Sequence, residues 1–328
     1  MALIEAKRLT KYFSAENGML HAVDEVDLEI EAGRTMGVVG ESGCGKSTLG
    51  RVVLRMLEPT GGEIWFDGKE ITGLSKRQIH RMRTKMQMIF QDPFSSIDPR
   101  MTITQTIEEP LIIHKIVRHK EERLKKVREL MDLVGIAVRY VNAYPHELDG
   151  GRRQRVGIAR ALAVDPVFIV CDEPVSALDV SIQAQILNLL QDIQKERNLT
   201  YMFITHNLSV VKYISDDICV MYLGQVVEKC STEDFFKSTL HPYSQALLSA
   251  ILVPDLDAER KRIILKGELT SPINPADACR FAPRCLYADE ECSECCPSLR
   301  DIGGGHFVRC HKISKTENRI ERVQAGAP

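Results

Sequence analysis

The sequence predicts an α/β fold with a helical subdomain, followed by a small cysteine-rich module at the C-terminal end. Short apolar segments of strand length, such as residues 36–39, 86–90 and 167–171, alternate with longer segments whose apolar residues recur at helical spacing. A glycine-rich turn joins one of these strands to a helix at residues 40–48. Six of the ten cysteines lie within residues 279–310. These three observations predict, in turn, the α/β core, the glycine-rich loop within it and the C-terminal cysteine-rich module.

The turn at residues 40–48 reads Gly-Glu-Ser-Gly-Cys-Gly-Lys-Ser-Thr and leads from a strand into a helix. This is the context of a P-loop, whose glycines let backbone amides turn toward phosphate groups. The helix adds its own free amides and the positive end of its dipole. A glycine-rich turn without a ligand is the alternative, and the Lys-Ser pair argues against it. We therefore predict a nucleotide site formed by Gly40, Ser42, Gly43, Cys44, Gly45, Lys46, Ser47 and Thr48.

Lys46 would reach the β and γ phosphates of this nucleotide, and the Ser47 hydroxyl would bind Mg²⁺. The first predicted strand ends in two aromatic residues, Tyr12 and Phe13. Either ring could stack on adenine, and Phe13 is the first choice. Packing of this aromatic pair against the core is an equally good explanation.

Polar residues follow three further predicted strands. Asp172 and Glu173 end the strand 167–171, and two carboxylates there suggest a Mg²⁺ ligand and a base for water. Gln91 ends the strand 86–90, where its amide could contact Mg²⁺ or the attacking water, although such a glutamine is often only solvated. His206 ends the strand 201–205 and could bind the γ-phosphate, although a single histidine is more often structural.

A second glycine-rich helix start lies at residues 148–155, which read Leu-Asp-Gly-Gly-Arg-Arg-Gln-Arg. Asp149 precedes Gly150 and Gly151, and together they predict another helix terminus that faces an anion. Asp179 closes a further polar turn, at residues 176–179, before the helix that starts at Val180.

Composition excludes several classes of protein. The 328 residues include 43 Lys and Arg against 45 Asp and Glu, so bulk charge does not indicate a nucleic-acid protein. No apolar stretch approaches the roughly 18 residues of a membrane span, and the first 30 residues lack the apolar region of a signal peptide. Four of the ten cysteines are scattered along the chain and six are clustered. This distribution indicates a reducing compartment and a local metal site rather than a set of disulfides.

The C-terminal cysteines do not identify a metal by spacing. Only Cys292 and Cys295 have the separation of a zinc knuckle, so the pattern predicts a metal without selecting one. A reduced loop without metal is the alternative. Such a short polar segment would then have little to order it.

These motifs appear in the order found in ABC-type ATPase domains, and the resemblance covers residues 1 to about 230. The phrases at 88–96, 172–181 and 241–243 resemble the ATP-binding subunits of oligopeptide and dipeptide importers, which also serve nickel and related solutes. Of the two paired ATPase subunits in that family, the chain is similar to the one usually encoded second.

The resemblance implies an organisation in three parts. Residues 1–230 would form the ATPase domain, with a helical subdomain at about 95–163. Residues 231–270 would form a helical extension and linker, and residues 271–328 a cysteine-rich module with a polar tail. Family members often end in a similar cysteine pattern, and in some of them four cysteines hold a [4Fe–4S] cluster. The matching residues here are Cys279, Cys285, Cys292 and Cys310, with zinc as the alternative metal and with Cys295 and Cys296 as extra cysteines.

The resemblance also implies partners and a location. Two ATPase domains would dimerise head to tail around two ATPs, each bound by one chain's P-loop and the other chain's 148–155 segment. The expected assembly is a heterodimer with the paired ATPase subunit, two membrane permease subunits and, indirectly, an extracytoplasmic solute-binding protein. The chain would be peripheral, on the cytoplasmic face of the membrane, with Gln91 near the permeases and with no nucleic-acid partner.

The chain departs from the family at the 148–155 signature, which usually reads Leu-Ser-Gly-Gly-Gln. Asp149 and Arg152 stand at the Ser and Gln positions. Asp149 can cap the helix as well as Ser can, but it places a negative charge where the family presents a hydroxyl to phosphate.

Two functions of other classes stay open. One is a soluble ABC ATPase that acts on nucleic acid or ribosomes. The other is a cluster-bearing redox sensor in which ATP only regulates. The sequence does not identify the transported solute.

Overall fold

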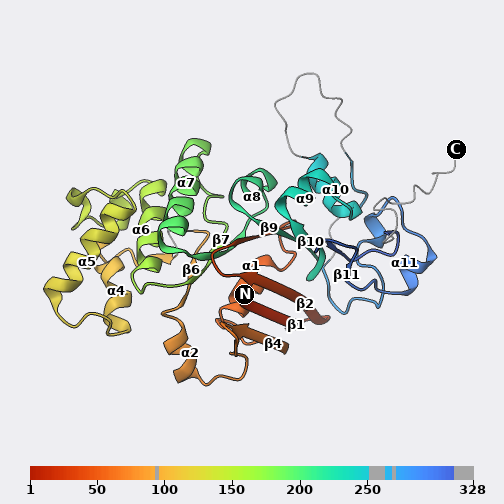
Figure 1. Ribbon diagram of the computed structural model, residues 1–328, viewed down its shortest axis with the longest axis horizontal. Helices are drawn as coiled ribbons and strands as arrows, with labels where there is room; N and C mark the ends of the chain where they lie inside the picture. The colour runs from red at the N-terminus through yellow and green to blue at the C-terminus, as the bar shows by residue number, and fades with distance from the viewer. Residues whose placement is uncertain (93–95, 251–262, 268–270, 314–328) are drawn as a thin grey trace. The chain divides into compact units, whose positions relative to one another are not determined.

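The computed structural model describes residues 1–92, 96–250, 263–267 and 271–313 (Figure 1). Residues 93–95, residues 251–262 and 268–270 of the predicted helical extension and linker, and the tail from residue 314 lie outside the described residues. The chain forms two compact units, and each is described by itself. Unit 1 contains residues 1–3, 30–34 and 67–204, and unit 2 contains residues 4–29, 35–66 and 205 onward.

Unit 1 contains a parallel sheet of three strands. The strand β7 (Phe168–Asp172) pairs with β6 (Met86–Ile89) on one side and with β8 (Thr200–Ile204) on the other. Every residue of β7 and β8 is buried, as expected for strands that are covered on both faces. Because parallel strands end at one edge of the sheet, the last residues of these three strands lie near one another there. They are Ile89, Asp172 and Ile204.

Helices make up most of the rest of unit 1: α2 (Lys76–Met82), α4 (Ile103–Ile113), α5 (Lys120–Leu133), α6 (Gly150–Leu162) and α7 (Val180–Arg197). The short elements are β5 (Lys69–Glu70) and the 3-10 turns η1 (Val138–Tyr140) and η2 (Pro145–Glu147). The helix α4 packs on α5 and α6, and α6 also packs on β6 and α7. Helices α4 to α6 lie within the range predicted for the helical subdomain, whose boundaries stay a prediction.

Unit 2 contains two sheets. In the first, β1 (Ala2–Ala15) lies between β2 (Gly18–Glu31) and β4 (Gly61–Phe66), with β1 and β4 antiparallel. In the second, the strand order is β3 (Thr35–Val39), β9 (Asp217–Tyr222), β10 (Gln225–Ser231), β12 (Phe307–Val308) and β11 (Arg300–Asp301). The β3–β9 pair is parallel and the remaining pairs are antiparallel. Together with unit 1, these sheets and helices confirm the predicted α/β fold.

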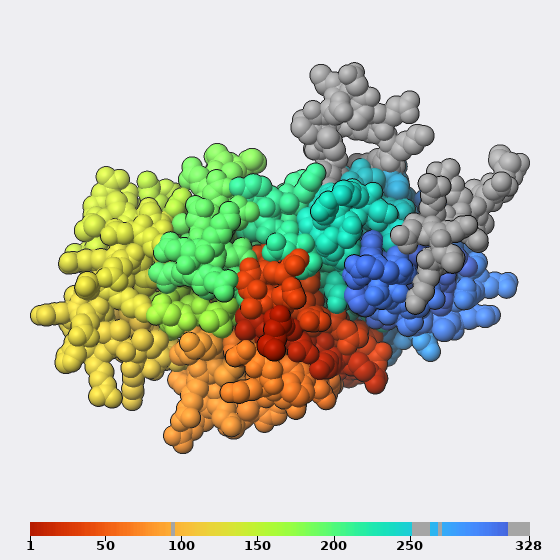
Figure 2. All heavy atoms as spheres, viewed as in Figure 1, coloured from red at the N-terminus to blue at the C-terminus, as the bar shows by residue number. Residues whose placement is uncertain are grey.

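The helices of unit 2 are α1 (Lys46–Val53), α8 (Leu208–Ile214), α9 (Thr232–Lys237), α10 (Pro242–Ser249) and α11 (Glu290–Glu294), with the 3-10 turn η3 (Ala282–Arg284). The cysteine-rich segment belongs to this unit and forms no unit of its own. Phe281 from that segment is buried against Tyr222 and Tyr243, and Ile273 bridges to Leu20 of β2. Figure 2 shows blue C-terminal residues beside the red N-terminal residues on this face.

Among the described residues, no helix has both the length and the apolar character needed to cross a membrane.

Candidate functional site

The P-loop is formed as predicted, between the buried strand β3 and helix α1 in unit 2. Gly45 has φ +104°, and a Cβ there would lie 2.0 Å from the carbonyl oxygen of Ala22, so only glycine fits. Gly45 is also the N-cap of α1 and offers no side chain to its first amides. Gly45 therefore supplies no side-chain acceptor of its own at the helix end that an anion can use.

Lys46 is buried inside this loop. Its ammonium donates to the carbonyl oxygens of Gly40 at 2.8 Å and Glu41 at 2.9 Å, and it lies 3.8 Å from the Cys44 sulfur. An ammonium group has three donors, so these three contacts can occupy all of them and hold the side chain in the loop. Burial raises the pKa of the Cys44 thiol, which keeps this cysteine neutral beside the lysine. The loop thus carries one positive charge at its centre.

The two aromatic residues of β1 have different surroundings. The Tyr12 hydroxyl donates to Asp24, and its ring stacks on His21 with centroids 3.9 Å apart. Phe13 makes a cation–π contact with Lys11, whose ammonium lies 4.9 Å from the ring centroid. Tyr12 is therefore engaged by two partners of its own unit, which favours Phe13 as the aromatic residue for a nucleotide base.

His206 also belongs to unit 2 and is exposed. The preceding amide of Thr205 donates to the carbonyl of Val38 at 3.1 Å, which places this turn beside the strand that enters the P-loop. The next residue, Asn207, caps helix α8 through the amide of Ser209. His206 therefore lies between two anchored neighbours.

Unit 1 brings Gln91 and Glu173 together. The Gln91 amide donates to the Glu173 carboxylate at 3.0 Å, although 82 residues separate them. Glu173 has φ +47° in the left-handed region, a conformation that costs non-glycine residues of order 1–3 kcal/mol and is concentrated at functional sites. Asp172, the last residue of β7, is buried with 2% of its surface exposed. The Asp172 carboxylate is thus enclosed, and the carboxylate of the next residue, Glu173, is hydrogen-bonded at the end of β7.

The 148–155 segment forms the start of α6, as predicted. Asp149 is the N-cap, and its carboxylate accepts the Arg152 amide at 2.7 Å and also pairs with the Arg152 guanidinium. Gly151 is required by packing, because a Cβ there would lie 2.7 Å from Ile182 of α7. Asp179 is the N-cap of α7 and uses its backbone carbonyl, at 2.8 Å from the Gln183 amide. Asp149 therefore caps the helix, as its side chain allows.

The four cysteines matched to a cluster gather in the C-terminal part of unit 2. All ten cysteines are free thiols, Cys292 and Cys310 are buried, and the Cys279 amide donates to the Cys292 carbonyl at 2.9 Å. Burial raises the pKa of Cys279 to about 11 and that of Cys310 to about 12, and nearby thiols add to both shifts. Thiols so raised are proton-bearing at neutral pH until a cation replaces the proton.

A different trio stands closer together than those cysteines. Glu228, Cys230 and His306 have ligand atoms within 4.8 Å of one another, and no three of the matched cysteines do so among the described residues. Glu228 is fully buried and accepts from the amides of Leu240 at 2.9 Å and His241 at 3.1 Å, while its carboxylate lies 2.8 Å from the His306 ring nitrogen. These bonds explain the buried carboxylate without a metal. Glu228 and His306 are 78 residues apart, so no local sequence pattern connects them and no role was predicted for this group.

Comparisons with known proteins agree with these motifs. Residues 23–176 match the ABC transporter family, and residues 227–292 match the C-terminal region of oligopeptide/dipeptide transporters. A putative oligopeptide transport ATP-binding protein of Bacillus subtilis, YkfD, is 48% identical over 327 residues and 99% of both chains. The oligopeptide transport ATP-binding protein OppF of the same organism is 53% identical over 94% of this chain and 96% of its own.

A solved structure also matches. The dimeric ATP-binding cassette MJ0796, bound to ADP and Pi in a post-hydrolysis state, has a TM-score of 0.65 and 30% identity. The match covers 70% of this chain and 98% of that one.

Proposed function

The chain belongs to the ATP-binding proteins of ABC transporters, in their oligopeptide/dipeptide branch, and we propose that it binds and hydrolyses ATP to energise peptide import. The observation that carries this function is similarity over almost the whole chain, including the C-terminal region that is specific to the peptide branch. The glycine-capped start of α1, with a buried lysine inside the preceding loop, supports the nucleotide site that this function requires. A related solute such as nickel is the alternative cargo.

We assign the P-loop residues to the phosphates, with Lys46 and His206 beside the γ-phosphate and Phe13 against the adenine ring. Glu173 takes the proton of the attacking water, whose oxygen bonds to the γ-phosphorus while the bond to the β-phosphate oxygen breaks. Gln91 holds the Glu173 carboxylate at 3.0 Å and so orients the base. Asp149, Gly150, Gly151 and Asp179 face the ATP of the partner subunit.

Ser47, Gln91 and Asp172 are the proposed donors for Mg²⁺. They offer a hydroxyl, an amide and a carboxylate oxygen, which are the hard ligands that this ion prefers. The Asp172 carboxylate is buried at the end of β7. Bound Mg²⁺ would neutralise charge that develops on the phosphate oxygens.

The cysteines fit a cluster better than a single zinc ion. Zinc held by four thiolates at about 2.3 Å brings the sulfur atoms within roughly 3.8 Å of one another. The described sulfur atoms form no such close group. Burial has the largest effect on the pKa values of Cys279 and Cys310, and the Cys285 and Cys292 thiols raise both further. We therefore propose that Cys279, Cys285, Cys292 and Cys310 hold a [4Fe–4S] cluster, which would staple the C-terminal segment.

The proposed assembly contains a paired ATPase subunit as a heterodimer, two permeases and an extracytoplasmic solute-binding protein, on the cytoplasmic face of the membrane. The relatives at 48% and 53% identity carry transport names, so they favour this assembly over a soluble ATPase of ribosomes or nucleic acid and over a redox sensor.

To test the function, the tagged full-length chain would be purified from its native membranes with its partners and placed in proteoliposomes. Peptide should stimulate ATP hydrolysis several-fold, and the Lys46→Ala variant should lose that activity. Recovery of the chain without permeases, or with ribosomes or nucleic acid, would contradict the proposal. Stimulation by nickel and not by peptide would reassign the cargo.

To test the cluster, anaerobically purified protein would be assayed for iron and sulfide. Serine at any of the four proposed ligands should deplete both and lower the unfolding temperature, because metal binding and folding are coupled in so small a segment. Cys295→Ser is the matched control, since Cys295 is exposed and outside the proposed set. Stoichiometric zinc without sulfide would reject the iron–sulfur assignment.

A further inference from the structure

Arg284, next to the proposed cluster ligand Cys285, reaches back to the P-loop. Its two terminal nitrogens donate to the two carboxylate oxygens of Glu41, at 2.8 Å and 3.2 Å. The side chains are 11% and 28% exposed. A guanidinium that meets both oxygens of a carboxylate is the strongest and most directional form of ion pair. All of these residues lie in unit 2.

Glu41 is held at three points, and one of them is the phosphate-binding lysine. Its carboxylate meets Arg284, its amide donates to the Tyr243 hydroxyl at 2.9 Å, and its carbonyl accepts from Lys46 at 2.9 Å. Tyr243 itself is fully buried against Tyr222 and Phe281. The position of Glu41 therefore determines where the loop places the ammonium group of Lys46.

Arg280 anchors the other side of the site. It pairs with Asp24 of β2 and donates to the carbonyl of Leu223. The adjacent Gly224 amide donates to the carbonyl of Cys44, inside the P-loop, at 2.9 Å. Asp24 also accepts from Tyr12, the neighbour of Phe13.

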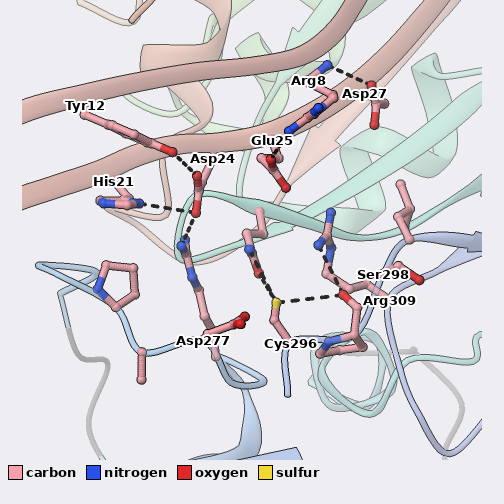
Figure 3. Close-up of a pocket in the computed structure, with 16 residues that line it drawn as sticks. Arg8, Tyr12, His21, Asp24, Glu25, Asp27, Asp277, Cys296, Ser298 and Arg309 are labelled. Atoms are coloured by element: carbon pink, nitrogen blue, oxygen red, sulfur yellow. Dashed lines mark hydrogen bonds and ion pairs between the residues drawn. The ribbon is translucent and has the colours of Figure 1, made fainter. Parts of the chain in front are cut away.

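Figure 3 shows Asp24 between Tyr12 and His21, at the wall of a cavity of about 520 Å³. Burial alone would raise the pKa of Asp24, but the hydrogen bond from Tyr12 and the charge of Arg280 lower it, so the carboxylate stays ionised. The Arg280–Asp24 pair is thus a fixed contact at neutral pH.

We propose that Arg280 and Arg284 are positioning residues for ATP: Arg284 holds the P-loop through Glu41, and Arg280 holds the strand that carries Phe13 through Asp24 and Tyr12. This inference rests on the proposed function, because it assigns these arginines to the same nucleotide site. A loop fixed in its binding geometry loses less conformational freedom when the ligand binds. The effect should therefore fall on ATP affinity, while the base Glu173 lies in unit 1 and keeps its own contacts.

The experiment measures ATP affinity of the purified full chain with a fluorescent ATP analogue, and KM and kcat in the assembled transporter. Glu41→Gln and Arg284→Gln should each raise KM for ATP about fivefold to tenfold, with kcat within about twofold. The double variant should be no worse than either single variant, because both remove one contact. Arg280→Gln should raise KM about threefold to fivefold.

Arg8→Gln is the matched control. Arg8 and Glu25 form an ion pair of the same 2.8 Å length in the same unit, but their side chains are 78% and 52% exposed. Such an exposed pair contributes little, so ATP affinity should not change. Arg284→Lys keeps the positive charge but loses the paired guanidinium contacts with both carboxylate oxygens, so it should recover part of the affinity for ATP. If Arg284→Gln fails to fold, Arg284→Lys replaces it.

Unchanged affinity in Glu41→Gln and Arg284→Gln would overturn the proposal, and so would an equal loss in Arg8→Gln. Additive effects in the double variant would show that Arg284 does not act through Glu41. Affinity for ATP is measured on the chain alone, so a failure to import peptide would reject the proposed function and leave this test intact.

Discussion

Two helices of this protein begin with glycine-rich segments, and they treat their first amides in opposite ways. Helix α1 follows the P-loop, with Gly45 as an N-cap that offers no side-chain acceptor. Helix α6 follows the signature segment, with Asp149 as an N-cap whose carboxylate already accepts the Arg152 amide. A helix start is a better anion site where the chain does not supply an anion itself, so we expect α1 to bind phosphate better than α6.

The starts of helices α1 and α6 also differ in charge. The P-loop encloses a lysine, which adds a positive charge to the favourable end of the α1 dipole. The start of α6 carries a carboxylate, paired with the Arg152 guanidinium. Those two side chains are 57% and 44% exposed, so solvent screens the pair and it stabilises the fold only weakly. We therefore expect catalysis at the ATP bound by α1 of this chain and weak activity at the ATP that faces α6.

The largest expected effect tests whether the ATP bound at the start of helix α1 is the one that is hydrolysed. Glu173→Gln removes the base and keeps its shape, so ATP should still bind while hydrolysis falls on the order of a hundredfold or more. Single-turnover hydrolysis in the assembled transporter measures this. Glu196→Gln is the control, because Glu196 is exposed at the end of α7 and should leave the rate unchanged. A rate near normal in Glu173→Gln would place turnover at the partner's P-loop instead.

The contrast between the two helices was largely predictable from the sequence. The glycines and the Lys-Ser pair of the P-loop are local signals, and so is an aspartate directly before two glycines. Cap chemistry acts over three residues, so the sequence alone showed that Asp149 could cap this helix, and the structure contains that cap.

Contacts between distant residues were not predictable in this way. Arg284 and Glu41 are 243 residues apart, and Gln91 and Glu173 are 82 apart. No periodicity connects such positions, because only the folded sheets bring their ends together. The partners of Arg280 and Arg284 therefore became apparent only in the folded chain.

A smaller effect is expected from repairing the signature. A carboxylate about 5 Å from a phosphate charge is repelled by roughly 3 kcal/mol per unit charge at an effective dielectric of about 20. The neutral hydrogen bond that Ser would supply is worth about 1 kcal/mol. Because Arg152 pairs with Asp149, it offsets part of this repulsion. Asp149→Ser should therefore raise hydrolysis at the partner's P-loop about threefold to tenfold, measured with this chain's own site silenced by Glu173→Gln.

Arg152→Gln sharpens this comparison in the opposite direction. It leaves the Asp149 charge without its partner, so hydrolysis at the partner's P-loop should fall further in the same silenced background. If neither substitution changes that rate, the charge at the start of α6 does not limit turnover there, and the two helix starts do not differ in function.

The smallest expected effect concerns stability and tests the cap itself. Asp149→Ala removes the acceptor for the Arg152 amide and should lower the free energy of unfolding by about 1 kcal/mol, whereas Asp149→Ser keeps an acceptor and should change it by less than about 0.5 kcal/mol. Ser42→Ala in the exposed part of the P-loop is the matched substitution, and it should change stability little because α1 has no side-chain cap to lose. Urea unfolding of the isolated chain measures all three. Equal losses in Asp149→Ala and Ser42→Ala would show that capping is not what separates the two helices, and the charge of Asp149 alone would then have to explain their difference.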